Sequence, residues 1–132
     1  METGAANLLG IGADLCAVAR LAAARARHGQ AFLDKVFTAA EQADCLGRGD
    51  PDASLAARWA AKEAVSKALG CGIGAELGLT SVEVVTDPAT GAPSVRLDAL
   101  GERTLRSRGG RRILVSLSHD GGMALATAAV VS

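Results

Sequence analysis

Hydrophobic positions recur along this chain with two different periods, one typical of strands and one typical of helices. Short apolar runs that end at Gly, Pro or Asp predict strands, and longer stretches with apolar residues at every third or fourth position predict helices. The predicted elements are strand 7–13, helix 17–27, helix 38–46, helix 54–70, strand 81–86, strand 93–97, helix 97–106, strand 112–118 and strand 123–131. The last four strands form two hairpins, and so the pattern predicts an α+β fold with an antiparallel sheet built from hairpins and a long helix and shorter helices on one face.

Capping residues mark several helix ends. Thr38 and Glu41 have the spacing of a capping box, in which each side chain satisfies a backbone group of the other residue. Ser54 is the predicted N-cap of the long helix, which ends at Gly70. Asp14 follows the first strand directly, so it is either the N-cap of the next helix or a carboxylate with a chemical role.

The long helix has an unusual distribution of side chains. At one hundred degrees per residue, its alanines share one side: Ala56, Ala57, Ala60, Ala61, Ala64 and Ala68. The charged side chains and the bulky apolar ones are interleaved on the other side: Arg58, Lys62, Glu63 and Lys67 with Leu55, Trp59, Val65 and Leu69. An ordinary surface helix separates these two kinds of residue. We therefore expect this helix to line a cleft or a partner surface.

Composition narrows the class of protein. The chain has 132 residues, which fits a single domain over 1–132, and its formal net charge is zero, which argues against nucleic acid as a partner. Its three cysteines are widely spaced, as expected of reduced thiols in a cytoplasmic protein, and no apolar run is long enough to span a membrane. Two basic runs, 20–28 and 103–112, are either solvated faces or docking sites for an anionic molecule.

Two carboxylates stand out as candidate metal ligands. Asp14 and Glu63 are too few to form a tight metal site from protein groups alone, but they suit Mg²⁺, which keeps several waters and accepts substrate phosphates. Arg58, Lys62 and Lys67 would then neutralise phosphate charge. Glu63 and Lys67 are also spaced as an ordinary helical ion pair, which is the competing interpretation.

His119 is the remaining candidate for chemistry, and the sequence lacks several well-known motifs. His119 lies in a predicted hairpin turn, where it either bonds the backbone or contacts a phosphate or a proton. The chain has no nucleophile elbow of a hydrolase, no complete dinucleotide fingerprint and no phosphate-binding loop of a nucleotide triphosphatase. Those three classes of site are excluded.

Four segments in order resemble the holo-acyl-carrier-protein synthases, the short class of 4′-phosphopantetheinyl transferases, and the resemblance covers nearly the whole chain. The segments are Gly10-Ile-Gly-Ala-Asp14 with Arg20 after it, Phe37-Thr-Ala-Ala-Glu41, Arg58-Trp-Ala-Ala-Lys62-Glu63-Ala-Val-Ser-Lys67-Ala, and Val115-Ser-Leu-Ser-His119. The third is the most specific. One departure is Cys16, which stands where the larger monomeric transferases have a second acidic ligand, and this favours the short class.

The resemblance implies an Mg²⁺-dependent transfer of the 4′-phosphopantetheine arm of coenzyme A to a serine of an apo-acyl carrier protein, with release of adenosine 3′,5′-bisphosphate. Asp14 and Glu63 correspond to the metal ligands, and Glu63 is our hypothesis for activating the serine. Lys67 would assist the departing bisphosphate. The residues that would contact coenzyme A are Arg58, Lys62, Lys67 and His119.

The resemblance also implies a partner and an assembly. Arg20 and Arg25 would dock the acidic carrier protein, whether that carrier serves fatty acid or polyketide synthesis. A homotrimer with active sites at the subunit interfaces is implied as well. Two other functions remain open at this point: an Mg²⁺-dependent phosphohydrolase, and a non-catalytic subunit that binds carrier proteins or coenzyme A.

Overall fold

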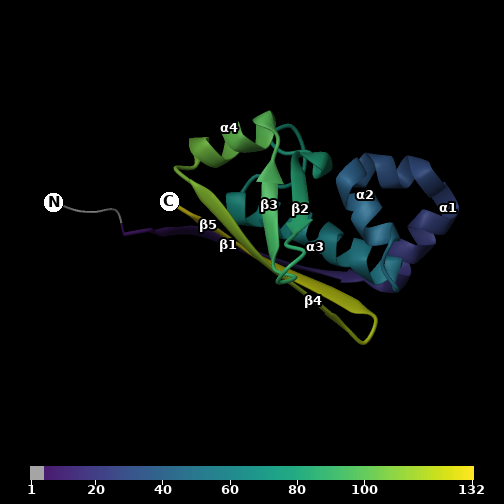
Figure 1. Ribbon diagram of the computed structural model, residues 1–132. Coiled ribbons are helices and arrows are strands. Elements are labelled where there is room, and N and C mark those ends of the chain that lie inside the picture. The colour runs from purple at the N-terminus through teal and green to yellow at the C-terminus, as the bar shows by residue number, and fades with distance from the viewer. Residues whose placement is uncertain (1–4) are drawn as a thin grey trace.

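The computed structural model describes residues 5–132, and it confirms the α+β class (Figure 1). The elements are β1 (Leu8–Ala17), α1 (Val18–Val36), α2 (Ala39–Leu46), α3 (Pro51–Leu69), a short 3₁₀ helix η1 (Leu79–Ser81), β2 (Val82–Thr86), β3 (Pro93–Leu97), α4 (Ala99–Ser107), β4 (Arg112–Asp120) and β5 (Met123–Val131). The strands form two antiparallel sheets: a three-stranded sheet in the order β1-β5-β4, and the separate hairpin β2-β3. Both predicted hairpins are present.

Helix α3 is the centre of the fold, because it packs along the three-stranded sheet and also contacts α1, α2 and β2. Its alanine side faces β1, where glycines allow a close approach. A Cβ atom on Gly12 would lie 2.0 Å from the Ala64 carbonyl oxygen, and one on Gly10 would lie 2.0 Å from that of Ala68. Helices α1 and α2 lie at one end of the molecule and α4 lies at the other, as Figure 1 shows. The glycines of β1 and the alanines of α3 therefore allow this strand to pack closely against the helix.

The first strand extends further than predicted, and a second helical stretch follows the predicted end of the first helix. Strand β1 continues through Asp14 to Ala17, so the Asp14 backbone is paired with Ala126 in the sheet and Asp14 is not a helix cap. Helix α1 continues to Val36 across a kink at Gly29, whose φ of 57° and ψ of −136° only glycine adopts readily. The helical turns before Gly29 therefore end close to the predicted residue 27, and a second helical stretch, which was not predicted, follows as far as Val36.

Helix α3 begins before the predicted cap. Its N-cap is Asp50, whose carboxylate accepts a hydrogen bond from the backbone N–H of Ala53 at 3.2 Å, and Pro51 occupies the first turn. Ser54 lies inside the helix. The predicted end is confirmed, because Gly70 caps α3 with a left-handed φ of 74°.

The capping box of α2 is present as predicted. The Thr38 hydroxyl accepts a hydrogen bond from the backbone N–H of Glu41 at 3.2 Å, and the Glu41 carboxylate accepts one from the backbone N–H of Thr38 at 3.0 Å. The second hairpin turns at Gly121 and Gly122, so His119 lies in the last part of β4.

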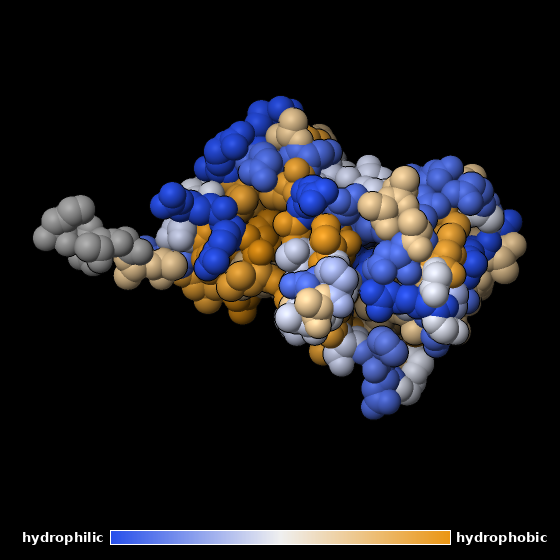
Figure 2. Space-filling model, in the orientation of Figure 1, coloured by the Kyte–Doolittle hydropathy of each residue, from blue (hydrophilic) through white to orange (hydrophobic). Residues whose placement is uncertain are grey.

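The face of the three-stranded sheet that points away from α3 is apolar and open to solvent. It carries exposed leucine and isoleucine side chains from all three strands: Leu9, Ile11 and Leu15 of β1, Leu114 of β4 and Leu125 of β5. Figure 2 shows hydrophobic surface gathered along these strands, whereas the end formed by α1 and α2 is largely hydrophilic. Within the described residues, no helix is long and apolar enough to cross a bilayer.

Candidate functional site

The structure brings together three of the predicted site residues, Asp14 from β1 and Glu63 and Lys67 from α3. The Lys67 ammonium donates hydrogen bonds to the Asp14 carboxylate at 3.1 Å and to the backbone carbonyl of Ala13 at 3.0 Å. Burial and the nearby charge of Asp14 raise the pKa of Glu63, and Lys67 partly offsets this effect. The cluster exists because the glycines of β1 allow that strand to lie directly against α3.

The ion pair in this cluster is not the Glu63–Lys67 helical pair of the competing interpretation. Lys67 pairs with Asp14 of the neighbouring strand, and within residues 5–132 the ion pairs include none between Glu63 and Lys67. The Glu63 carboxylate is therefore free to bind something else.

A hard cation suits this pair of carboxylates. Two acidic groups lie close enough that one raises the pKa of the other, and a positive charge between them would relieve that repulsion. The residues described here contain no group of three or more His, Cys, Asp or Glu side chains able to hold a metal ion. A pair of carboxylates suits an ion such as Mg²⁺, which completes its shell with water and phosphate oxygens.

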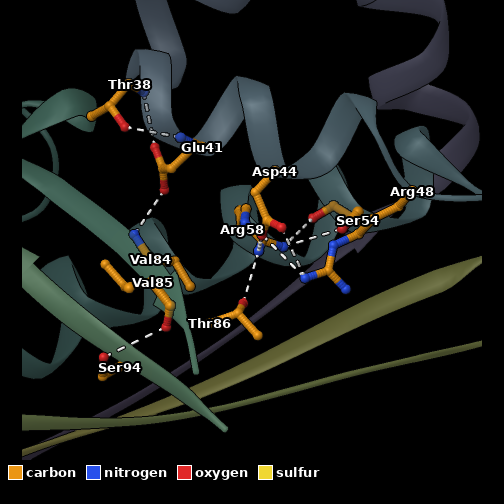
Figure 3. Close-up of polar contacts among 10 residues, drawn as sticks. All are labelled: Thr38, Glu41, Asp44, Arg48, Ser54, Arg58, Val84, Val85, Thr86 and Ser94. Atoms are coloured by element: carbon orange, nitrogen blue, oxygen red, sulfur yellow. Dashed lines mark hydrogen bonds and ion pairs between the residues drawn. The ribbon is translucent and has the colours of Figure 1, made fainter. Parts of the chain in front are cut away.

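Lys62 has a different position from the one expected, because it is fully buried. Its ammonium donates to the Glu41 carboxylate at 2.7 Å, to the carbonyl of Leu79 at 2.9 Å and to the carbonyl of Val82. The second oxygen of Glu41 accepts a hydrogen bond from the backbone N–H of Val84 at 2.8 Å (Figure 3). All three ammonium hydrogens have partners inside the protein. The expected contact between Lys62 and a phosphate therefore does not fit this structure, and Lys62 instead joins α3 to α2 and β2.

Burial also lowers the pKa of Lys62, although the Glu41 carboxylate beside it opposes this effect. Neither the Lys62 nor the Glu41 side chain contacts solvent, so this ion pair has a structural role in the core of the fold.

Arg58 and His119 line a second polar region, a cleft of 160 Å³ between the start of α3, the β2–β3 hairpin and the end of β4. Arg48, from the connection after α2, lines the same cleft. The Arg58 side chain is 4% exposed, and its guanidinium donates to the Ser54 hydroxyl at 3.1 Å and to the Thr86 hydroxyl at 3.0 Å. Two arginines and a histidine make this cleft suitable for an anion.

The cleft and the carboxylate cluster lie on different sides of α3. Arg58 and Glu63 are five positions apart, which corresponds to about 140° around a helix, and Lys67 is about 180° from Arg58. Asp14, Glu63 and Lys67 therefore form one group within a single chain, while Arg58 and His119 form another.

On α1, the two arginines predicted to bind a partner differ from each other. Arg25 forms an ion pair with Asp52 at 2.9 Å. Arg20 is exposed and lines a pocket of 160 Å³ together with Trp59 and Phe32, whose rings are stacked with centroids 6.1 Å apart. Arg20 thus combines an available positive charge with an adjacent apolar surface.

Several contacts in these sites were not found from the sequence. Arg48 lies between the two predicted helices 38–46 and 54–70 and was given no role, and Glu41 was assigned to a capping box and a family segment but not to an ion pair. No spacing rule connects Glu41 to Lys62, because they lie on different helices. Nothing in a single sequence shows that a glutamate at the N3 position of a helix, such as Glu41, also faces the core.

Comparisons with known proteins identify the class. Residues 10–128 match the 4′-phosphopantetheinyl transferase superfamily. The chain belongs to this superfamily, and it is a phosphopantetheinyl transferase.

The relatives narrow the class further. The holo-[acyl-carrier-protein] synthase of Chlorobaculum parvum is 48% identical over 120 residues, which cover 91% of this chain and 96% of that protein. The crystal structure of the holo-[acyl-carrier-protein] synthase of Neisseria meningitidis matches with a TM-score of 0.87 at 29% identity, covering 94% of this chain and 98% of that one. The Helicobacter pylori synthase in complex with coenzyme A matches with a TM-score of 0.80 at 31% identity, covering 91% and 98%. These findings confirm the resemblance to holo-acyl-carrier-protein synthases.

Proposed function

We propose that this enzyme transfers the 4′-phosphopantetheine group of coenzyme A to a serine of an apo-acyl carrier protein and releases adenosine 3′,5′-bisphosphate. The observation that carries the proposal is the cluster of Asp14, Glu63 and Lys67 between β1 and α3, in a chain of this superfamily. The similarity to a synthase structure solved with coenzyme A supports this choice of donor. In the reaction, the serine oxygen bonds to the phosphorus that carries pantetheine, and the bond from this phosphorus to the bridging oxygen breaks.

Asp14 and Glu63 would hold Mg²⁺, which when bound supplies positive charge at the reacting phosphate. Lys67, whose ammonium lies 3.1 Å from the Asp14 carboxylate, would neutralise charge on the departing bisphosphate. The raised pKa of Glu63 suits a carboxylate that accepts the proton of the serine hydroxyl.

The arginine cleft would hold phosphates of coenzyme A. Arg58 and His119, which the sequence suggested for this role, are joined there by Arg48. Lys62 has no part in it, because its three donors are engaged in the interior.

A homotrimer with active sites between subunits fits two features of the structure. The carboxylate cluster and the cleft lie on different sides of α3, so one coenzyme A molecule would reach both if a second copy brought its cleft to the cluster of the first. The exposed apolar face of the three-stranded sheet provides a surface that a second copy would bury. Light scattering tests this: we expect Ile11→Glu to give inactive monomers, and the control Ala40→Glu, at an exposed position of α2, to leave the assembly intact. A fully active monomer would contradict the proposal.

Arg20 and the pocket beside it would dock the acidic carrier protein, with Arg25 contributing less because Asp52 already neutralises it.

The three cysteines are free thiols, which fits action in the reducing cytoplasm.

The intact mass of an apo-acyl carrier protein tests the proposed reaction. We expect incubation with this enzyme, coenzyme A and Mg²⁺ to add one phosphopantetheine group, and a chelator to prevent the addition. Glu63→Gln should slow transfer by about 10²–10³-fold and leave the fold intact. Release of phosphate from nucleotides without a change in the carrier would indicate a phosphohydrolase instead, and binding without transfer would indicate a non-catalytic subunit.

A further inference from the structure

Asp44 places a negative charge against Arg48 and Arg58, the two arginines that line the cleft. Its carboxylate accepts hydrogen bonds from Arg48 at 3.1 and 3.2 Å, and it also forms an ion pair with Arg58 (Figure 3). The Asp44 side chain is 41% exposed, whereas the Arg58 side chain is 4% exposed. One carboxylate from α2 thus bridges the two guanidinium groups that we assign to phosphate binding.

The hydrogen bonds of Arg58 leave little capacity for another anion. One terminal nitrogen donates to the hydroxyl and carbonyl oxygens of Ser54, and the other donates to Thr86 and Asp44. All four terminal N–H groups are therefore engaged. The remaining donor, Nε, is buried and has no partner among the described residues. An incoming phosphate gains full access to this guanidinium only by replacing one of the existing acceptors.

Among these acceptors, Asp44 is the one that can leave. Ser54 is buried on the same helix as Arg58, and Thr86 lies at the end of β2, so both are fixed by the fold. Asp44 lies on the exposed side of α2 and can turn toward water. A carboxylate and a phosphate oxygen also offer the same kind of acceptor to a guanidinium.

A buried arginine requires an anionic partner when no ligand is bound. Without one, its charge would remain uncompensated in a site that excludes most water. Asp44 meets this requirement in the free protein, but its charge repels an anion that enters the cleft.

We propose that Asp44 is an internal competitor of the phosphate group of a nucleotide in the cleft of Arg48, Arg58 and His119. It occupies the anion position in the free enzyme, yields it when the nucleotide binds and takes it back on release. This inference rests on the proposed function for the identity of the nucleotide, and it deepens that proposal by assigning the residue that limits affinity. Asp44 is a positioning residue, since it acts on the arginines and not on the reacting atoms.

Calorimetric titration with adenosine 3′,5′-bisphosphate tests the inference, in buffer with a chelator so that the carboxylate cluster contributes no metal. We expect Asp44→Asn to lower the dissociation constant about three- to tenfold, the order of effect of removing a unit charge beside an anion at a partly exposed site. The matched control is Glu102→Gln, which removes a similarly exposed carboxylate that pairs with an arginine on α4. It should leave the dissociation constant unchanged.

Thermal denaturation gives a second readout, with Asp44→Ser as a second variant. Both substitutions should lower the melting temperature of the free protein, and saturating bisphosphate should raise it by more than in the unchanged protein, because the ligand replaces the missing carboxylate. Equal or weaker binding by the variants would overturn the inference, as would bisphosphate binding that Arg48→Gln does not weaken, or no binding by any of the proteins.

The proposed function has a separate readout. Tighter bisphosphate binding by Asp44→Asn, without transfer to any carrier by the unchanged protein, would support the competitor role and refute the reaction. Normal transfer with an unchanged dissociation constant would refute the competitor role alone.

Discussion

Two sides of helix α3 use the same kinds of side chain in opposite ways. On one side, Lys62 is fully buried against the Glu41 carboxylate and two backbone carbonyls. On the other side, Lys67 is 53% exposed and contacts the Asp14 carboxylate and one carbonyl. The two lysines are five residues apart on one helix. Their surroundings, rather than their residue type, decide which one holds the fold together and which one is available for chemistry.

The difference arises from what covers each side. Helix α2, the short helix η1 and strand β2 lie over Lys62 and each supply one acceptor for its ammonium. Near Lys67 the nearest element is β1, whose carboxylate at Asp14 sits beside a second carboxylate at Glu63. On the Lys62 side, the ammonium is paired with one carboxylate and every hydrogen has an acceptor. On the Lys67 side, two carboxylates face one lysine, which leaves an excess of negative charge that a cation or a substrate can use.

Replacement of Lys62 is the strongest test of this comparison. We expect Lys62→Met to lower the free energy of unfolding by about 3–5 kcal/mol, because it leaves the Glu41 carboxylate buried without its counter-ion. Urea denaturation measures the change. The matched control is Lys67→Met, which should alter stability by about 1 kcal/mol or less, since its ion pair is exposed. Similar losses for the two variants would show that the sides of α3 do not differ as described.

Catalysis should respond in the opposite order. We expect Glu63→Gln and Lys67→Met each to reduce kcat for phosphopantetheine transfer by about 10²–10³-fold, because each removes a charge that acts on the reacting phosphate. The measurement is the rate at which the carrier protein gains mass. A Glu41→Gln variant that remains folded should retain most of its kcat, so a loss as large as that of Glu63→Gln would contradict the division of roles.

The sequence predicted the side of α3 that carries Glu63 and Lys67 better than the side that carries Lys62. Asp14, Glu63 and Lys67 were found because the resemblance connects them and because carboxylates near a cationic helix have a recognisable use. Lys62 lies in the same motif, and the motif alone could not show that α2 and β2 cover it. That burial depends on a contact between residues 21 positions apart, which no local periodicity encodes.

The errors in the fold have a similar origin. Local rules found the capping box at Thr38, the Gly70 cap and both hairpins, since each depends on neighbouring residues. They missed the extension of β1 through Asp14, because that extension comes from pairing with β5 at the far end of the chain.

Helix α1 offers a smaller version of the same comparison. Arg25 is paired with Asp52, while Arg20 is exposed beside an apolar pocket. We expect Arg20→Gln to raise KM for the carrier protein about tenfold and to leave KM for coenzyme A unchanged, because the charge would steer and hold an acidic partner. Arg25→Gln should have a weaker effect in steady-state kinetics. An increase in KM for coenzyme A alone would refute the docking role of Arg20.

The smallest expected effect is a change in protein stability caused by the raised pKa of Glu63, on the Lys67 side of α3. The folded protein has a raised Glu63 pKa, above the ordinary value of 4.5, so folding favours the protonated carboxyl. The stability contribution of Glu63 is therefore complete below pH 4.5 and is lost as the pH rises through the raised pKa. In metal-free buffer at neutral pH, Glu63→Gln should then stabilise the protein, by about 0.5 kcal/mol or less because the side chain is partly exposed to solvent.

Thermal denaturation with a chelator, at neutral pH and near pH 4, measures this gain. The gain should disappear at the lower pH, where Glu63 is protonated and resembles Gln. Added Mg²⁺ should reverse the order at neutral pH, since the ion would stabilise the unchanged protein and not the variant. A variant that is less stable at neutral pH without metal would mean that the Glu63 carboxylate supports the fold, and the two sides of α3 would then be alike.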